Sequence, residues 1–149
     1  MRDSKSIMRY VHENDTHFLE ERDPGRWKHG PYYYGNYVYG RDLFGCGAEQ
    51  CEKELYLEEE VIRAFTCKYS DYGSDFEKVM VCLTNRSRII IGYENKEKSY
   101  EYDISDYDLN RMKLNGNELT ISNKTFRLND SSECRKIIDW LKDMVKKYS

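Results

Sequence analysis

The chain is poor in proline and has no long apolar segment. Its 149 residues include two prolines, Pro24 and Pro31, and its longest aliphatic run is the three isoleucines at 89–91. A membrane-spanning helix needs about 20 consecutive apolar residues, so stable insertion into a bilayer is not predicted. The first six residues, largely polar, do not resemble a signal peptide. We therefore expect a cytoplasmic protein.

Cysteine is too scarce for a disulfide framework. The odd number of five cysteines favours reduced thiols, as is typical of a cytosolic chain. Three of them fall on predicted strands or on the apolar stripe of a predicted helix, and we expect these three to be buried packing residues: Cys67, Cys82 and Cys134.

The charge balance argues against a nucleic-acid-binding protein. Residues 1–60 hold 8 Lys and Arg against 13 Asp and Glu, a balance of −5, whereas residues 61–149 have a balance of +2. Neither part is polybasic, so no nucleic-acid partner is expected. The chain also lacks a glycine-rich phosphate loop and a Ser/His/Asp pattern. The acidic runs 58–60 and 103–108 are predicted to be solvated.

Seven short runs typical of β-strands follow one another after residue 60. No predicted helix separates them, so the sheet should be antiparallel. The turn at 115–117 (Asn-Gly-Asn) is typical of a hairpin. The predicted strands are 61–69, 78–84, 88–93, 99–104, 109–114, 118–122 and 125–128.

An amphipathic helix is predicted over residues 131–148. Asp130, followed three residues later by Glu133, forms a capping-box pattern at its start. Apolar residues at three- and four-residue spacing form one stripe, which should pack on the sheet. They are Cys134, Ile137, Ile138, Leu141, Met144, Val145 and Tyr148.

The first 57 residues form an extension of different composition, rich in Tyr and Gly. Residues 7–19 predict a short helix and 24–31 a loop. The tyrosine-rich segment 32–40, with Gly35-Asn36 at its centre, predicts either a two-stranded ribbon or an ordered coil. Residues 48–60 favour a helix.

Seven strands in meander order followed by a helix resemble the pleckstrin-homology (PH) superfold. Residues 57–65, 81–90 and 102–107 are similar to the first strand, the second-to-third strand turn and the fourth-strand region of bacterial PH-like domains. Ser87 departs from the pattern, since the family's turn is usually shorter. The resemblance covers about 57–148 and implies an α+β fold: a seven-stranded bent antiparallel sheet capped by a C-terminal helix. It divides the chain into an N-terminal extension, 1–57, and a PH-like domain, 58–149.

The same resemblance implies a binding or docking module and not an enzyme. Many relatives bind phosphoinositides through basic residues on the first two strands, where this chain has Lys68 and Lys78. Because Asp71, Asp75 and Glu77 lie beside them, phosphoinositide binding is not carried over. Weak lipid contact stays open, and a lipid or small-ligand binder is one alternative.

The extension supplies the predicted partner-binding residues. Tyr and Trp are enriched at protein–protein hot spots, because they bury large rigid rings at low entropic cost. We expect a protein partner or self-association through this extension, an exposed edge or surface of the PH-like sheet, or both. The predicted partner-binding residues are Trp27, Tyr32, Tyr34, Tyr37, Tyr39 and Arg41.

No metal or other cofactor and no catalytic residue is predicted. Cys46, Cys51 and His29 are the candidates for a zinc site, but the four residues between the two cysteines are at the loose end of the spacing in structural sites, and the chain has no second cysteine pair. Cys46 lacks the neighbouring base that a thiol nucleophile needs. A small zinc-binding or thiol-dependent protein is the remaining alternative.

Overall fold

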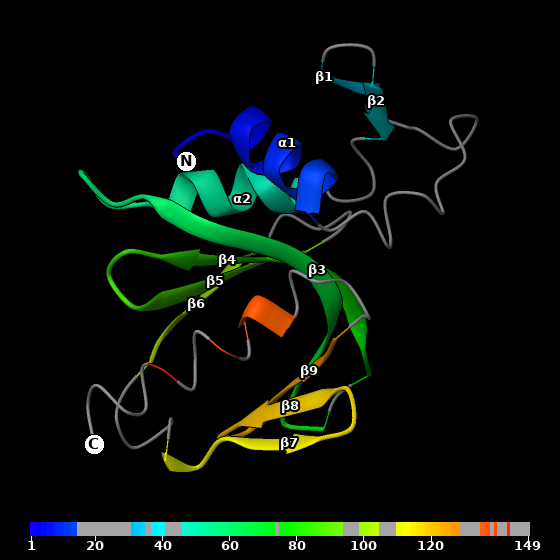
Figure 1. The fold of residues 1–149 in the computed structure, drawn as a ribbon, viewed down its shortest axis with the longest axis vertical. Coiled ribbons are helices and arrows are strands. Elements are labelled where there is room, and N and C mark those ends of the chain that lie inside the picture. The colour runs from blue at the N-terminus through cyan, green and yellow to red at the C-terminus, as the bar shows by residue number, and fades with distance from the viewer. Residues whose placement is uncertain are drawn as a thin grey trace.

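The computed structural model describes residues 1–14, 31–34, 37–40, 46–73, 75–93, 99–104, 110–128, 135–137, 139 and 143. Its main feature is a seven-stranded antiparallel sheet with two helices on one face (Figure 1). The helices are α1 (Ser4–Asn14) and α2 (Cys46–Glu54). The strands of the sheet are β3 (Val61–Asp71), β4 (Glu77–Thr84), β5 (Arg88–Tyr93), β6 (Ser99–Asp103), β7 (Lys113–Asn115), β8 (Glu118–Ile121) and β9 (Lys124–Arg127). The predicted α+β class and antiparallel sheet are thus confirmed.

The strand order is β6–β5–β4–β3–β9–β8–β7, with β3 at the centre. β3 pairs with β4 along most of its length but with β9 only over residues 68–71. A register shift between Val61 and Arg63 adds a bulge near its start. The long β3 curves from one half of the sheet into the other, so that β7–β9 lie apart from β4–β6 (Figure 1).

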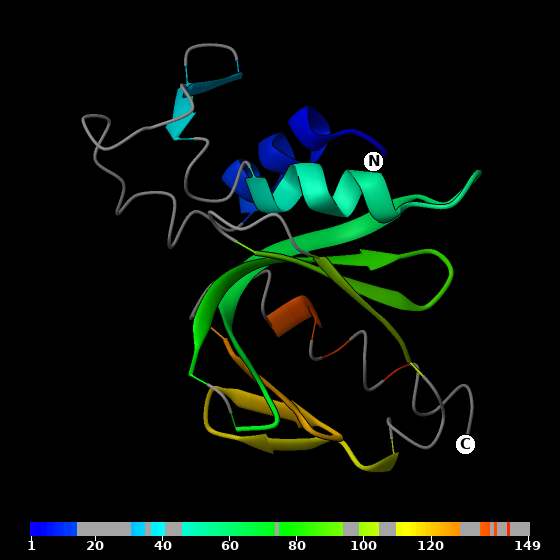
Figure 2. The same ribbon diagram turned by 180° about the vertical axis from the view of Figure 1, so that it is seen from behind.

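Buried apolar residues gather on both faces of the sheet. On the concave side, alternate residues of β3, such as Phe65 and Cys67, pack with residues of β4, β5, β8 and β9. On the other side, Ile7, Met8 and Val11 of α1 and further residues of α2 cover β3–β5. Figure 2 shows both helices together on this face. The predicted burial of Cys67 and Cys82 is confirmed.

Helix α1 begins at an aspartate cap. The Ser6 backbone N–H donates to Asp3 Oδ1 at 2.7 Å, which satisfies one of the free donors of the first turn. This hydrogen bond lowers the pKa of Asp3. The helix was predicted over residues 7–19 but begins at Ser4, because its cap precedes the apolar residues. The predicted positions 15–19 lie outside the described residues.

Two glycines allow α2 to lie directly on the sheet. A Cβ atom on Gly92 of β5 would come within 2.1 Å of the Gly47 carbonyl oxygen, and one on Gly47 within 2.8 Å of the Gly92 oxygen. The backbones of α2 and β5 are in direct contact at these two glycines, and a side chain at either position would push the helix away from the strand.

The prediction that α2 extends to residue 60 is wrong, since the helix ends at Glu54. Residues 56–59 form a turn in which the Glu59 N–H donates to the Tyr56 oxygen at 3.1 Å. Glu58 has a φ of 67° there, which a helix cannot accommodate. The helix ends because the Glu59 side chain bonds to distant strands, and these tertiary contacts override local propensity.

The strands after residue 109 differ from prediction in their limits. The predicted strand 109–114 is shorter in the structure, where β7 comprises Lys113–Asn115, because β8 offers partners only for these residues before it turns into β9. The last turn lies at 122–123 and not at 123–124, since Ser122 takes the left-handed conformation (φ 57°) and Ile121 pairs with Lys124. The hairpin at Gly116 (φ 61°) is confirmed.

The predicted C-terminal helix is described only in part. Residues 135–137, 139 and 143 are helical, and residues 135–137 lie between the two halves of the bent sheet (Figures 1 and 2). Ile137 is buried among the concave-side residues, which agrees with a helix packed on the sheet. Its predicted cap, Asp130–Glu133, and Cys134 lie outside the described residues.

Candidate binding surfaces

The tyrosine-rich segment forms a two-stranded ribbon, one of the two arrangements predicted for it. Strand β1 (Pro31–Tyr34) pairs antiparallel with β2 (Tyr37–Gly40). Tyr32 is opposite Tyr39, and Tyr34 is opposite Tyr37. Directly paired residues share a face, and so do residues two apart in a strand. The register therefore places all four on one face of the ribbon, which we call the four-tyrosine face, and Tyr33 and Val38 on the other.

The remaining predicted site residues are not brought together. Trp27, Arg41 and His29 lie outside the described residues. Cys46 and Cys51 are five positions apart on α2, or about 140° around its axis, so they are not on one face. Among the described residues, no group of three or more His, Cys, Asp or Glu could hold a metal ion.

The Cys51 thiol is an internal packing group. It is fully buried and donates to the carbonyl oxygens of Met80 (3.9 Å) and Ile90 (3.7 Å). Burial raises the pKa of Cys51 well above its ordinary value, and the neighbouring Cys82 thiol raises it further. A thiol held in its protonated form is a poor metal ligand or nucleophile.

A buried ion pair joins the turn after α2 to the β4–β5 hairpin. The Glu59 carboxylate, fully buried, pairs with the Arg88 guanidinium, which is 3% exposed. It also accepts hydrogen bonds from the Thr84 hydroxyl (2.8 Å) and the Tyr56 backbone N–H (3.0 Å). Glu59 was predicted to be solvated together with its neighbours; that prediction is wrong for Glu59, because Arg88 and Thr84 compensate its desolvation.

Arg88 continues this network to the edge of the sheet. Its guanidinium pairs with Glu101 of β6, lies 3.7 Å from Asp103, and stacks 4.0 Å from the centroid of the Tyr56 ring. It also donates to the Glu54 carbonyl oxygen, at the end of α2. One cation thus serves three carboxylates, those of Glu59, Glu101 and Asp103, and the group has a formal charge of −2.

Strand β6 forms one edge of the sheet, with β5 on its inner side. The Ile104 N–H donates to the Ser87 oxygen at 3.1 Å. In an antiparallel pair the bonding residues alternate, so Tyr102 and Tyr100 also bond toward β5. The main-chain groups of Glu101 and Asp103 consequently point to the outer side, where the described residues provide no further strand.

Basic residues line up across the three central strands of the sheet, β4, β3 and β9. Lys68 of β3 is directly opposite both Lys78 of β4 and Arg127 of β9. Side chains in such positions are neighbours about 5 Å apart, so like charges there repel. Arg127 is neutralised in part by Glu118, whose carboxylate lies 3.0 Å away. We call Lys78, Lys68 and Arg127 the basic row.

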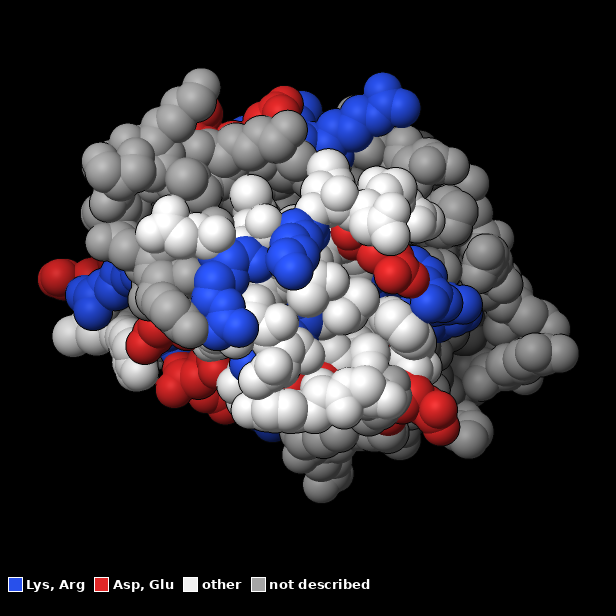
Figure 3. Space-filling model, turned by 90° about the horizontal axis from the view of Figure 1, so that it is seen from below, with Lys and Arg blue, Asp and Glu red and all other residues white. Residues whose placement is uncertain are grey.

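Charges of both signs lie on the underside of the molecule. Figure 3 shows this face, from the side of β7 and β8 in Figure 1, with Lys and Arg near its centre and Asp and Glu mainly toward its margins. Such mixing gives a weaker field than a surface of one sign.

Tyrosines surround a buried lysine on strand β9. The Lys124 ammonium, on a residue 5% exposed, lies 4.5 Å from the ring centroid of Tyr102 and 5.1 Å from that of Tyr100. Tyr69 and Tyr93 pack edge to face nearby on the concave side. Burial, with the Asp71 carboxylate as a second cause, raises the pKa of Tyr93 to about 12 and that of Tyr69 further.

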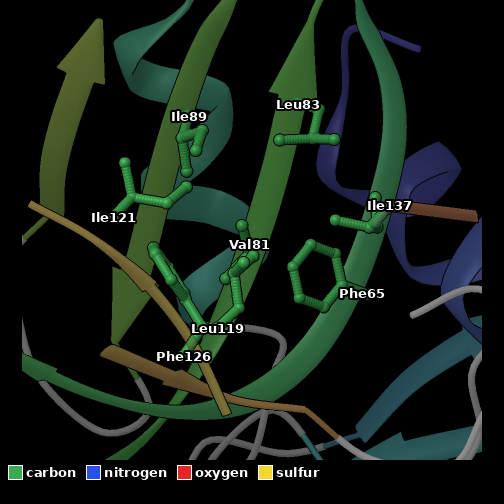
Figure 4. Close-up of a pocket in the computed structure, with 8 residues that line it drawn as sticks. All are labelled: Phe65, Val81, Leu83, Ile89, Leu119, Ile121, Phe126 and Ile137. Atoms are coloured by element: carbon green, nitrogen blue, oxygen red, sulfur yellow. The ribbon is translucent and has the colours of Figure 1, made fainter. Parts of the chain in front are cut away.

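An apolar cavity lies on the concave side of the sheet. Figure 4 shows its eight lining residues, which come from β3, β4, β5, β8, β9 and the C-terminal helical segment. Its volume of about 10 Å³ is near the minimum that holds one water molecule and far below the roughly 300 Å³ at which ligand pockets begin. We interpret it as imperfect packing of the core.

Glu59, Arg88 and Lys124 are buried charged residues that were not predicted from the sequence. Glu59 lies in a run of three glutamates, whose outer members are exposed, and nothing in that run marks the middle one. Arg88 directly precedes three isoleucines in a predicted strand, which was the available signal for burial.

Comparisons of the chain with protein-family models, curated proteins and solved structures find no match. No helix among the described residues is long and apolar enough to cross a membrane.

Proposed function

We propose that the protein is a non-enzymatic binding module that docks a protein partner through the four-tyrosine face of the β1–β2 ribbon. The observation that carries this proposal is the register, which places Tyr32, Tyr34, Tyr37 and Tyr39 on one face. Four tyrosines at these positions would offer a large contact area at low entropic cost. They would also offer four hydroxyl groups for hydrogen bonds to the partner.

The fold supports the same role. We infer a PH-like domain, since the curved antiparallel sheet and the helical residues against its concave side are compatible with that fold. PH-like domains serve as docking modules, and the extension would then be an addition specific to this chain. In this proposal α1 and α2 anchor the extension, because their apolar residues cover β3–β5.

The test uses the full chain with two matched pairs of substitutions. Tyr34→Ser with Tyr37→Ser alters one facing pair of the four-tyrosine face, and Tyr33→Ser with Val38→Ser alters a facing pair on the other face. Each tagged protein is incubated with an extract of the source organism, and bound proteins are quantified by mass spectrometry. A partner should bind to wild type and to the Tyr33/Val38 control but fall at least tenfold for the Tyr34/Tyr37 variant.

Equal capture by the Tyr34/Tyr37 variant would contradict the proposal, provided that circular dichroism shows both variants to be folded. Self-association is checked separately by sedimentation velocity of the three proteins. A dimer lost only in the Tyr34/Tyr37 variant would identify the partner as a second copy of the chain.

The basic row supports a second candidate function, weak binding to anionic lipid. Lys68 has basic neighbours on both sides, and an anionic surface would relieve their repulsion. Vesicles of phosphatidylserine and phosphatidylcholine should then sediment the wild type at low salt and release it at high salt. Lys68→Ser with Lys78→Ser should abolish this binding. The control, Arg111→Ser with Lys113→Ser, removes the same charge from exposed positions outside the row.

A further inference from the structure

The outer edge of β6 combines an open strand with excess negative charge. Glu101 and Asp103 direct their main-chain groups outward by the alternation described above, and their side chains are 46% and 86% exposed. Arg88 is the cation that both share with the buried Glu59. Hydrogen-bonding capacity and uncompensated charge therefore lie together along one strand.

We propose that β6 receives an extended segment of a partner protein as an additional strand, with Lys or Arg at alternate positions of that segment. Main-chain hydrogen bonds to Glu101 and Asp103 would supply affinity, as in strand addition generally. Glu101 and Asp103 are two residues apart and share a face, so a partner with basic residues at the same spacing meets both. This inference rests on the proposed role as a protein-binding module and adds a second surface and the partner's chemistry.

The other edge and self-pairing fit this role less well. β7, at the opposite end of the sheet, comprises three residues, all exposed, whereas β6 comprises five. Two copies paired edge to edge through β6 would bring the carboxylates of Glu101 and Asp103 close to those of the other copy. Such like-charge contacts are the usual protection of an edge strand against self-association.

Three short peptides test the proposal by nuclear magnetic resonance titration of the full-length protein. The probe is the blocked peptide Lys-Thr-Lys-Val-Lys-Thr. The second peptide has Glu in place of each Lys, and the third keeps the lysines but carries N-methyl groups at alternate residues, so that one edge cannot hydrogen-bond. We expect saturable shifts of the Glu101 and Asp103 amides with the first peptide, and affinity at least tenfold weaker for the other two.

A charge reversal on the protein completes the test. Asp103→Lys should weaken binding of the basic peptide at least tenfold, whereas Asp75→Lys, the same change at an exposed position in the β3–β4 connection, should leave it within twofold. Equal binding of the acidic or the N-methylated peptide would overturn the proposal, as would no binding at all or a dimer formed through β6. The Tyr34/Tyr37 variant should bind the peptide normally, so failure of the ribbon hypothesis and failure at β6 are distinguishable.

Discussion

Glu59 and Arg88, 29 residues apart in the chain, form an ion pair that is almost completely excluded from solvent. Through it the turn after α2, the β4–β5 hairpin and the edge strand β6 are held together, because Arg88 also contacts Glu54 and Glu101. A buried pair of this kind stabilises the fold little compared with an apolar pair of the same shape. Removing only one of the two partners is nevertheless strongly destabilising, because the other charge stays buried without compensation.

Arg88→Met should destabilise the protein by about 3–5 kcal/mol, because it leaves the Glu59 carboxylate buried without a cation. Glu59→Gln added to Arg88→Met removes that charge and should recover at least about 1 kcal/mol of the loss. Urea unfolding followed by circular dichroism measures both. Arg86→Met is the control: among the described residues, the exposed Arg86 side chain donates one long hydrogen bond, to the Leu57 oxygen, so its loss should change stability by less than about 0.5 kcal/mol. A double variant less stable than Arg88→Met alone would contradict the interpretation.

The contact between Gly47 and Gly92 predicts a second large effect. Gly92→Ala would place a Cβ atom 2.1 Å from a backbone oxygen, so α2 must move away from β5, at a cost of about 3 kcal/mol or more. A Cβ atom at Gly116 would meet open space, so Gly116→Ala should lower stability only because of its positive φ, by about 1 kcal/mol. Thermal unfolding compares the two variants. A Gly92→Ala protein as stable as Gly116→Ala would show that the helix does not lie as close as the structure indicates.

The sequence was informative where a strand or turn is determined locally. Alternation and the Asn-Gly-Asn turn predicted the strand series and the Gly116 hairpin, because side chains within each run decide which face is buried. The end of α2 was not predictable, since it depends on Glu59 reaching Arg88 and Thr84 across the chain. The four-tyrosine face could not be predicted, because it follows from the pairing register of β1 and β2. The two turn residues, Gly35 and Asn36, did not decide between a ribbon and a coil.

Ser87, in the turn between β4 and β5, takes the left-handed conformation, with a φ of 58°. Glycine adopts this conformation without strain, whereas a β-branched residue rarely does. Ser87→Gly should therefore stabilise the protein by about 0.5 kcal/mol, and Ser87→Val should destabilise it by about 1–3 kcal/mol. Urea midpoints that do not follow the order Gly, Ser, Val would contradict a left-handed residue here.

Tyr69 and Tyr93 predict how stability depends on pH in the alkaline range. Burial raises the pKa of both phenols in the folded protein, to about 12 for Tyr93, whereas tyrosine in an unfolded chain titrates near 10. Stability from keeping these phenols neutral is complete below pH 10 and is lost as the pH rises toward 12, since ionisation then favours the unfolded state. The ionisation of each such tyrosine should lower the free energy of unfolding by about 1 kcal/mol at pH 11 relative to pH 8.

Tyr69→Phe isolates this effect, because Tyr69 is 2% exposed and burial is the main cause that raises the pKa of its phenol. The stability of the variant at pH 8 is its reference value. Between pH 8 and pH 11 its stability, measured by urea unfolding, should fall less than that of the wild type. Tyr72→Phe is the matched control, as Tyr72 is 76% exposed. If Tyr69→Phe and Tyr72→Phe lose the same stability over this range, the Tyr69 phenol is not protected from ionisation by the fold.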